Sequence, residues 1–594
     1  MKTRGDFSAD RRLIMISAIA IFIGAICAFV AMLLLSMISF FTNLFYYHQL
    51  SLTPRTPAGS PLGLLMIFVP VVGGLIIGLM ARYGSEKIRG HGIPEALEAI
   101  LFGKSIMSPK VAILKPLSSA ISIGSGGPFG AEGPIIMTGG AFGSIVAQFF
   151  HLTAVERKTL LVAGAAAGMS ATFASPIAAV LLAVELLLFE WKPRSLVPVA
   201  LASAVAAAVR PHLLGAGPLF PVTTQGLVEW QSLLAAAGVG LLAGIFSSSL
   251  SAALYKMEDA FDHIPIHWMW RPAIGGLIVG IGGYFQPRAL GVGYDVIGDL
   301  LQGHLTTSLV LGLVTVKCII WIMSLASGTS GGVLAPLLIM GCALGTLESK
   351  FLPGGSHVLW PLISMAAVLG GMMRAPFTAV IFALELTHDV NSLPPLLIAS
   401  VIAYAFTVLV MKRSILTEKV ARRGYDIFRE YGVDPLEKCR IMEVMSKTVT
   451  SIPASLPARE IPARYFSATN KHRGYPVIAD DGKLIGILTI SDLLGPSALE
   501  KRETFKAADL IRTEPIVAFA EESCRDAAER MAIHGVGRLP VLSSTGAQEL
   551  VGIITRSDLL KARLSHFEEE KKYERHLGTA ETLAWPLPTP TFKK

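Results

Sequence analysis

Apolar residues dominate the first two thirds of the chain in long runs between residues 13 and 411, whereas residues 412–594 have the mixed composition of a water-soluble sequence. The first run, residues 13–46, exceeds the roughly 20 apolar residues that a membrane span needs, which predicts a long tilted helix. Later runs such as 134–148 and 376–385 are shorter and are separated by Gly and Pro. Short helices at membrane depth are tolerated only where they pack inside protein or line a cavity. The pattern therefore predicts a multispanning membrane domain, typical of transport proteins, followed by a soluble domain.

Composition and charge support this division. The 594 residues are 52% hydrophobic and only 16% charged, whereas a soluble domain is about 25% charged. The net charge of +8 indicates membrane topology rather than affinity for nucleic acid, because basic residues that flank the apolar region favour the cytoplasmic side. We predict a multi-pass protein of the cell (plasma or inner) membrane, in contact with lipid and with both termini cytoplasmic. The flanking basic residues are Lys2, Arg4, Arg11, Arg12, Lys412, Arg413, Lys419, Arg422 and Arg423.

The membrane region repeats itself after about 200 residues. The segment Pro176–Leu186 aligns without gaps to Pro376–Leu386, and a second set of Gly, Ser and Pro positions matches at a shift of 202 residues. We therefore predict two halves, at about 60–210 and 230–410, related by inversion, as is usual when two halves build one midplane site. Glu185 and Glu385 end matching helices. A carboxylate in an apolar run is a candidate functional group, but its repetition favours a structural role, in which each glutamate binds backbone N–H groups or the other half's loop.

Three pentapeptides of the form Gly-x-x-x-Pro precede apolar helical runs: Gly90–Pro94, Gly130–Pro134 and Gly332–Pro336. Glycine leaves the backbone bare, and the N-terminus of a helix carries unpaired N–H donors and a partial positive charge. Together these features predict an anion site. The spacing alone also fits three ordinary helix starts, because Gly and Pro occur in loops everywhere. One carboxylate, Glu132, lies in the second loop, and we expect it to compete with the anion for the same place.

The soluble region contains a second duplication, in which residues 474–494 resemble residues 538–560. Each copy predicts a strand, a Gly turn, a second strand and a helix capped by Thr-x-Ser-Asp. The predicted organisation is a cytoplasmic segment (1–12), a membrane domain (13–425), a linker (426–440), two modules (441–496 and 505–565) and a charged, Pro-rich tail (566–594). The five cysteines lack metal-ligand and disulfide spacing, so no metal site is predicted.

The three pentapeptides in this order, with Arg374-Ala-Pro376 and Glu385-Leu-Thr387 further on, resemble the CLC family of chloride channels and proton/chloride exchangers. The duplicated soluble part resembles a pair of CBS domains. The resemblance implies an α-helical polytopic membrane protein with two inverted repeats of tilted and broken helices, followed by a soluble α/β CBS pair. It also implies a homodimer with one anion pathway per subunit and chloride or a related anion as the permeating ion.

By the same resemblance Glu132 is the gating glutamate, which occupies the outer anion site when ionised and leaves it when protonated or displaced. Backbone N–H groups would bind the anion without trapping it as a buried cation does. The resemblance assigns anion binding to Gly90, His91, Gly92, Ile93, Gly130, Ala131, Gly133, Val333, Leu334 and Leu416.

Three of these positions depart from the family pattern. His91 stands where a coordinating Ser is usual, Ala131 where a basic residue is common, and Leu416 about where a coordinating Tyr is expected. His91 would donate a hydrogen bond to the anion and add pH dependence if protonated; the alternative is that it only packs at the loop. These changes leave the expected fold unaltered and put chloride selectivity in question, with nitrate and fluoride as other candidates.

The position after Glu185 distinguishes two transport mechanisms. Family exchangers commonly carry a proton-transfer glutamate there, and this chain has Leu186, which cannot carry a proton through a dry apolar wall. We therefore predict a voltage- or pH-gated chloride channel, with a proton-coupled antiporter as the alternative. A cation carrier would need several carboxylates at midplane. An intramembrane enzyme lacks support because no catalytic constellation such as His-Glu-x-x-His appears.

No cofactor is required for this function, but the CBS pair suggests an adenine nucleotide. Thr489, Asp492, Thr555 and Asp558 match the family's Thr/Ser-x-x-Asp pattern, in which acidic side chains bind ribose hydroxyls. The alternative is that these residues are only helix caps.

Overall fold

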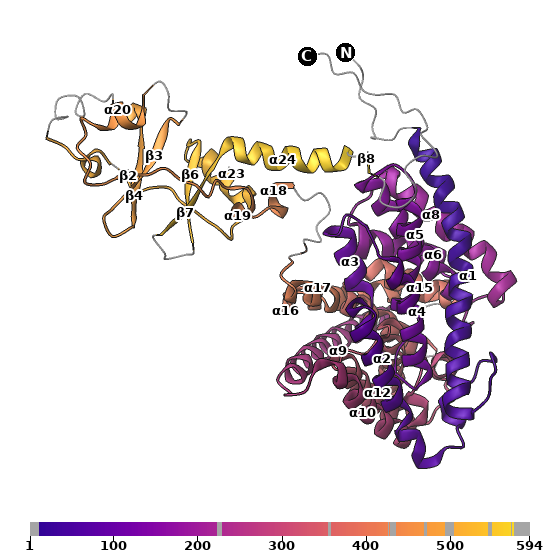
Figure 1. The fold of residues 1–594 in the computed structure, drawn as a ribbon. Coiled ribbons are helices and arrows are strands. Elements are labelled where there is room, and N and C mark those ends of the chain that lie inside the picture. The colour runs from indigo at the N-terminus through magenta and orange to yellow at the C-terminus, as the bar shows by residue number, and fades with distance from the viewer. Residues whose placement is uncertain are drawn as a thin grey trace. The chain divides into compact units, whose positions relative to one another are not determined.

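The structure, a computed structural model, describes residues 11–222, 229–353, 358–425, 427, 435–467, 472–493, 504–511, 513–543, 549–571 and 573–574. The chain divides into two units, shown in Figure 1. Unit 1 comprises residues 1–429 with 573–594, and unit 2 comprises residues 430–572. Lys2, Arg4, most of the predicted linker and the Pro-rich tail lie outside the described residues.

Unit 1 is built from helices of very different lengths. The first half contains α1 (Arg12–Tyr47), α2 (Val69–Tyr83), α3 (Ile93–Leu101), α4 (Pro109–Gly124), α5 (Glu132–Gln148), α6 (Ala154–Phe173), α7 (Pro176–Leu182), a π-helical continuation η4 (Ala183–Leu188) and α8 (Pro193–Leu214). The second half contains α9 (Trp230–Asp262), α10 (Arg271–Phe285), α11 (Tyr294–Leu301), α12 (Thr307–Ala326), α13 (Leu334–Glu348), α14 (Leu359–Met373), α15 (Pro376–Thr387) and α16 (Leu393–Val410). Helix α17 (Ile415–Arg422) follows both halves.

Short elements join these helices. They are the 3-10 turns η1 (Pro57–Gly59), η2 (Gly63–Ile67), η3 (Glu86–Ile88), η5 (Trp268–Trp270), η6 (Pro287–Ala289) and η7 (Val390–Ser392), and strand β1 (Leu152–Thr153). Strand β8 (Tyr573–Glu574), near the end of the chain, pairs antiparallel with β1.

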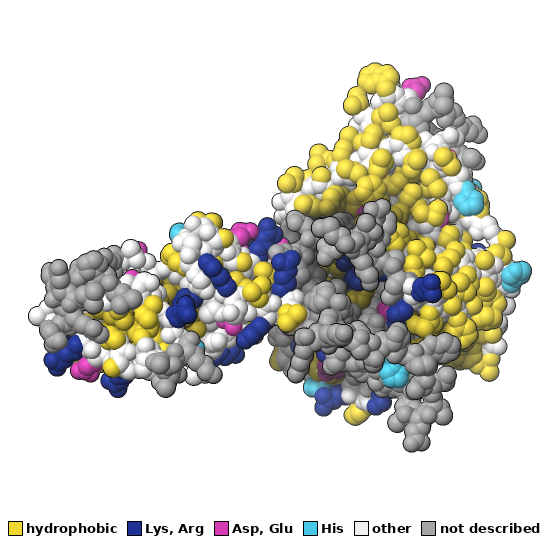
Figure 2. Space-filling view, turned by 90° about the horizontal axis from the view of Figure 1, so that it is seen from above, with side chains coloured by type: hydrophobic (Ala, Val, Ile, Leu, Met, Phe, Trp, Pro, Cys, Tyr) yellow, Lys and Arg dark blue, Asp and Glu magenta, His cyan; other side chains and the backbone are white. Residues whose placement is uncertain are grey.

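The predicted mixture of long and short apolar helices is confirmed. Among the described residues six helical segments are long and apolar enough to cross a membrane, and the first of them, Arg12–Tyr47, is the long helix predicted from the first apolar run. Four further apolar helices are shorter: Pro176–Leu188, Leu334–Glu348, Leu359–Met373 and Pro376–Thr387. Hydrophobic side chains cover a broad continuous area of this unit in Figure 2, as a surface in contact with lipid requires.

The two halves have the same order of helices and the same packing partners. Helix α1 packs on α8 as α9 packs on α16, and α5 packs on α6 as α13 packs on α14. The long helix α1 therefore belongs to the first half, which begins before the predicted position near residue 60.

The contact between α2 and α10 is reciprocal: a glycine of each helix packs against the equivalent proline of the other helix. A Cβ atom on Gly74 would lie 2.4 Å from the Pro272 carbonyl oxygen. The equivalent Cβ atom on Gly276, 202 positions later, would lie 2.3 Å from the Pro70 carbonyl oxygen. Such close backbone approach is possible only because glycine has no side chain.

The direction of this contact shows how the halves are related. One turn along α2 from Gly74, a Cβ on Gly78 would lie 2.0 Å from the carbonyl oxygen of Met269, which precedes Pro272. The helices are therefore antiparallel, and equivalent residues of antiparallel helices exchange places only about a two-fold axis perpendicular to both. The predicted inversion of the two halves follows from this geometry.

Glu185 and Glu385 have the predicted structural role, and each serves the opposite half. The Glu385 carboxylate accepts hydrogen bonds from the backbone N–H groups of Ile177 (2.9 Å) and Ala178 (2.8 Å), at the start of α7. The Glu185 carboxylate accepts from the N–H groups of Phe377 (3.3 Å) and Thr378 (2.8 Å), at the start of α15. Each carboxylate satisfies donors that α7 and α15 cannot pair internally.

Unit 2 contains the predicted duplication. After α18 (Pro435–Lys438) and α19 (Ile441–Val444), the first module contains β2 (Ile452–Pro453), α20 (Ile461–Tyr465), β3 (Gly474–Ile478), β4 (Leu484–Thr489) and α21 (Ile490–Leu493). The second contains η8 (Ala507–Leu510), β5 (Ala518–Phe519), α23 (Cys524–Ile533), β6 (Arg538–Leu542), β7 (Leu550–Thr555) and α24 (Arg556–Lys571). The sheets have equivalent orders, β2-β3-β4 and β5-β6-β7, each with one parallel and one antiparallel pairing.

We predict that Glu385→Ala lowers the stability of unit 1, because the partly buried N–H group of Ile177 and the buried N–H group of Ala178 would lose their acceptors. The expected cost is about 2 kcal/mol, measured as thermal unfolding of the detergent-solubilised protein. Glu385→Gln keeps one acceptor oxygen and should cost less than half as much. Equal stability of the alanine variant and the wild type would contradict the capping role.

Candidate anion-binding site

The three predicted loops meet at one place in unit 1. Gly130 and Gly332 exchange two backbone hydrogen bonds, of 3.3 Å and 3.0 Å, in an antiparallel bridge. The Gly90 N–H donates to the Thr329 carbonyl at 2.8 Å, and the Gly331 N–H donates to the Gly90 carbonyl at 3.3 Å. The loop before α13 is therefore bonded to the loops before α3 and α5.

Glycine is required where these loops touch. A Cβ on Gly133 would lie 1.9 Å from the carbonyl oxygen of His91, which is closer than atoms can approach. Gly92 has a φ of +88°, and a Cβ there would lie 2.8 Å from the Gly133 carbonyl oxygen. Both the close approach and the positive φ exclude larger residues.

The helices begin slightly earlier than the prolines suggest. Helix α3 begins at Ile93, α5 at Glu132 and α13 at Leu334, two or three residues ahead of the predicted helical runs. The residues before these helices are Gly92, Ala131 and Val333, and none provides a side-chain cap. At α3 the Glu95 carboxylate accepts from the Gly92 N–H at 3.0 Å. The other N–H donors of the first turns lack the acceptors that Ser, Thr or Asp at the N-cap would supply.

The Glu132 carboxylate lies over the junction of the loops. The residue is fully buried. A Cβ on Gly130 would lie 1.7 Å from Glu132 Oε2, and a Cβ on Gly332 would lie 2.9 Å from the same oxygen. The Tyr294 hydroxyl donates to Oε1 at 3.2 Å, while Oε2 has no hydrogen-bond partner among the described residues. The negative group thus occupies the position where the loops before α5 and α13 join.

His91 is also buried at this junction, with 2% of its surface exposed, and its Nδ1 has no hydrogen-bond partner in the part of the chain that the structure describes. A buried ring nitrogen without a partner is costly. This observation favours the donor role over the packing role, since a bound anion would provide the missing partner.

Helix α17 packs against α3 and carries Leu416, which is 1% exposed. One turn later, Lys419 reaches the loop before α3, where a Cβ on Gly90 would lie 2.3 Å from the Lys419 Nζ. Unlike α3, α5 and α13, helix α17 has a side-chain cap, because the Ser414 hydroxyl accepts from the Thr417 N–H at 3.3 Å. Leu416 itself adds only an apolar side chain.

Two buried lysines were not predicted. Lys115 donates to the carbonyls of Ile88 (2.8 Å) and Gly90 (2.7 Å). The equivalent Lys317, 202 residues later, donates to the carbonyls of Ala289 (2.8 Å) and Gly291 (3.1 Å). The repeat alignment contains the signal that would have found them, because both are cations within apolar helices, 202 residues apart, at the spacing of the halves.

The proton-transfer position is apolar. Leu186 is 1% exposed and lies in η4, the π-helical segment in which Glu185 is bonded to the start of α15. The second half has a regular α-helix at the equivalent place, since α15 continues to Thr387.

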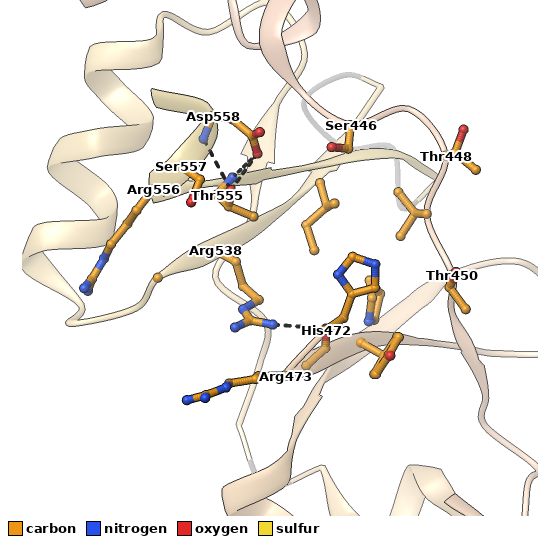
Figure 3. Close-up of a pocket in the computed structure, with 16 residues that line it drawn as sticks. Ser446, Thr448, Thr450, His472, Arg473, Arg538, Thr555, Arg556, Ser557 and Asp558 are labelled. Carbon is orange, nitrogen blue, oxygen red and sulfur yellow. Dashed lines mark hydrogen bonds between the residues drawn. The ribbon is translucent and has the colours of Figure 1, made fainter. Parts of the chain in front are cut away.

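The predicted nucleotide residues are helix caps in both modules, and the pair of the second module also lines a pocket. Asp492 Oδ2 accepts from the Thr489 N–H at 2.8 Å, and Asp558 Oδ2 accepts from the Thr555 N–H at 2.9 Å. Thr555 and Asp558 line a cavity of about 490 Å³ (Figure 3), whereas Thr489 and Asp492 are not among its lining residues.

This pocket, which we call the CBS pocket, is rich in cationic side chains. Its lining includes His472, Arg473, Arg538 and Arg556 with Asp558 (Figure 3). Partial burial lowers the pKa of the Arg538 guanidinium, whose Nη1 donates to the Gly474 carbonyl at 3.2 Å. A partly desolvated cation bonded only to a neutral carbonyl is suited to an anionic ligand.

Comparison with known proteins identifies the family. A family model described as voltage gated chloride channel matches residues 73–408, more than half of the chain, and a CBS domain model matches residues 441–496 and 507–565. The chain belongs to the voltage-gated chloride channel (CLC) family. The matches agree closely with the predicted CBS domains at 441–496 and 505–565.

Curated relatives match the membrane domain. The chain is 30% identical over 369 residues to a voltage-gated ClC-type chloride channel ClcB of Escherichia coli O81 (strain ED1a), covering 60% of this chain and 87% of that protein. It is 28% identical over 373 residues to a putative chloride channel protein ClcB-like of Ralstonia nicotianae (strain ATCC BAA-1114 / GMI1000), covering 61% and 87%.

Solved structures share the fold at low sequence identity. A slow cyanobacterial Cl⁻/H⁺ antiporter has a TM-score of 0.61 at 20% identity, covering 70% of this chain and 99% of that one. A CLC-type fluoride/proton antiporter has a TM-score of 0.59 at 20% identity, covering 69% and 98%. A eukaryotic CLC transporter has a TM-score of 0.60 at 18% identity and covers 92% of this chain and 98% of that one.

Proposed function

We propose that the protein conducts chloride across a membrane and that the ionised Glu132 carboxylate gates the pathway by occupying the anion site. The observation that carries this proposal is the position of the carboxylate at the junction of Gly130 and Gly332, where α5 and α13 begin without side-chain caps. A place that accommodates a carboxylate between helix N-termini also suits chloride, and only one of the two occupies it at a time.

The surroundings favour an anion that binds and leaves. Backbone N–H groups carry partial charges, so they attract an anion without holding it as a free ammonium group would. Lys115 and Lys317 are buried close to the loops, and their ammonium groups are already bonded to backbone carbonyls. They add positive potential to the site while remaining fixed in the scaffold.

Channel-like conduction is the form of transport that we propose. Support comes from Leu186, because a buried leucine at the proton-transfer position interrupts the route by which protons would reach Glu132. A proton-coupled exchanger is the alternative, and two of the similar solved structures are antiporters, one of chloride and one of fluoride.

Selectivity for chloride depends on His91 in this proposal. Its unpaired Nδ1 supplies the side-chain contact to the anion, since Leu334 and Leu416 offer none. The backbone N–H groups at Ile93, Ala131, Gly133, Val333 and Leu334 complete the donor set. The Gly92 N–H already donates to the Glu95 carboxylate at 3.0 Å, and Gly90 and Gly130 join the loops through backbone bridges.

A homodimer in the lipid membrane is part of the proposal. Ile177 and Phe377 occupy equivalent positions at the starts of α7 and α15 and are 59% and 56% exposed. Two apolar side chains presented by rigidly capped helices suit a contact with a second subunit.

An adenine nucleotide is proposed as a ligand of the CBS pocket. The cavity volume of about 490 Å³ lies in the range of small-molecule sites. Arginine side chains suit phosphate groups and Asp558 suits a ribose hydroxyl. Thr555 and Asp558 belong to this lining, whereas Thr489 and Asp492 do not line this pocket, so we propose binding at Thr555 and Asp558.

We predict that Glu132→Gln abolishes most of the pH dependence of chloride flux, because a neutral amide cannot compete as a charge for the anion site. In the wild type, flux should rise as pH falls and the carboxyl group takes up a proton, by up to about tenfold per pH unit. In the variant, flux in proteoliposomes should vary less than about twofold over the same range.

Gly130→Ala offers an independent route to the same state. A Cβ at this position would lie 1.7 Å from Glu132 Oε2, so the carboxylate must leave although it keeps its charge. Gly238→Ala is the matched control, because no atom lies within 4 Å of its Cβ. A wild-type pH profile in Glu132→Gln would refute gating by this carboxylate.

Proton coupling is predicted to be absent. Liposomes with an outward chloride gradient and membrane potential clamped at zero should show no uphill proton uptake, because Leu186 cannot relay a proton. Uphill uptake would establish the exchanger and leave Glu132 as the gate. Fluxes of chloride, nitrate, fluoride and sodium under the same conditions would define the selectivity.

We predict that calorimetry of the full-length protein detects the heat of binding of ATP, ADP or AMP at millimolar concentration or below. Arg538→Gln should weaken binding about tenfold through loss of a charge-assisted contact. Asp492→Asn is the matched control and should bind as the wild type does. The absence of heat with all three nucleotides would leave the CBS pair as a structural module.

A further inference from the structure

Tyr294 is the first residue of α11, and its hydroxyl donates to Glu132 Oε1 at 3.2 Å. Among the described residues it provides the one side-chain hydrogen bond to this carboxylate. A hydrogen bond from a neutral donor to an ionised acceptor is stronger than one between neutral groups. The contact therefore favours the ionised form of Glu132 in its present position.

The turn that precedes Tyr294 is held from two sides. The Lys317 ammonium group donates to the carbonyls of Ala289 and Gly291, and the Gly291 N–H donates to the Gly126 carbonyl at 3.2 Å. Gly126 belongs to the glycine-rich loop that leads to Glu132. The turn before α11 and the loop that leads to Glu132 are thus bonded directly to each other. This bond fixes the position of the start of α11 relative to Glu132.

Aromatic contacts fix the direction of the Tyr294 ring. Phe173 packs edge-to-face against it with ring centroids 5.9 Å apart, and Phe220 lies 6.3 Å away at a tilted angle. Phe173 also packs against Phe382 at 5.1 Å. A ring held by neighbours on α6 and in the segment before α9 has little rotamer freedom, so its hydroxyl is aimed at the carboxylate in advance.

The two halves differ at this position. The turn Gly291-Val292-Gly293-Tyr294 corresponds by the repeat to Gly90-His91-Gly92-Ile93. Both turns are held by a buried lysine through equivalent carbonyls. The first turn presents backbone donors and an imidazole to the site, whereas the second presents a phenol. Tyr294 is thus a specialised residue of one half, because the shared scaffold does not require a hydroxyl there.

We propose that Tyr294 is a positioning residue of the gate, whose hydroxyl holds the ionised Glu132 carboxylate in the anion site and so sets the pH at which the gate opens. This inference rests on the proposed gating role of Glu132. When the carboxyl group is protonated, the charge-assisted bond is lost and the side chain is released.

Other charged groups also act on Glu132 and must stay constant in a test. Lys317 on α12 contributes positive charge and has Asp295 of α11 as its neighbour. Two further titratable residues lie near the site: His91 in the loop before α3, and Lys115 on α4, which donates to the Gly90 carbonyl. Helix α3 carries Glu95 and Glu98, which are both paired with Arg423, and α4 also carries Lys110 in its first turn. The Tyr46 hydroxyl of α1 donates to the Ser125 carbonyl at 3.1 Å. The remaining charged residues of the helices packed on α5 lie at their far ends: Arg12 on α1, Glu156, Arg157 and Lys158 on α6, and Glu348 on α13. Removing one hydroxyl changes none of them.

The test is the pH profile of chloride flux in Tyr294→Phe, which keeps the ring and its packing. The ionised carboxylate loses a donor, so the carboxyl group takes up a proton at higher pH. The pH of half-maximal flux should rise by about one unit. Tyr284→Phe, which removes an exposed phenol on α10, is the matched control and should keep the wild-type midpoint.

The double variant Tyr294→Phe with Glu132→Gln separates gating from an effect on permeation. Its flux should equal that of Glu132→Gln alone, because the hydroxyl would have no carboxylate to hold. An unchanged midpoint in Tyr294→Phe, or an equal change of flux with and without the carboxylate, would overturn the inference. If Glu132→Gln itself kept the wild-type pH profile, the proposed gate would fail first, so the two failures are distinguishable.

Discussion

Backbone N–H groups that are left without partners inside a dry protein are the constraint on which this structure depends. Helices α3, α5 and α13 all begin at one place with N-cap residues whose side chains provide no cap, and glycine allows their loops to touch there. An unpaired donor in such an environment is costly, so the site requires a negative partner. In the structure Glu132 fills that place, which makes the stability of the site and its occupation by an anion two aspects of the same interaction.

The duplicated architecture supplies the rigidity that such a site needs. Equivalent glycines exchange contacts across α2 and α10, and equivalent lysines hold the turns before α3 and α11. The glycine contacts join the two halves, and each lysine fixes a turn of its own half beside the junction. At the junction the halves differ in the side chains that they present, with His91 and Glu132 in the first half and Tyr294 in the second.

The sequence predicted the membrane domain, its duplication, the three loops and the CBS pair because each leaves a pattern in Gly, Pro and apolar positions. The capping role of Glu185 and Glu385 followed from their repetition and is confirmed. The early starts of α3 and α13 were missed, since proline tolerates several positions in a first turn. Tyr294 was missed because its partner Glu132 is 162 residues away, and no local pattern records a contact between the two halves.

The exchanged caps also impose an order on biogenesis. The N–H groups of Ile177 and Ala178 pair with a carboxylate 208 and 207 residues further along the chain. At ordinary rates of translation that carboxylate appears about 10 to 40 s later. Until then the start of α7 has bare donors inside the membrane, where each unpaired group is expensive. The first half therefore cannot mature alone, and the newly made segment must stay near the insertion machinery or another protective surface until the second half arrives.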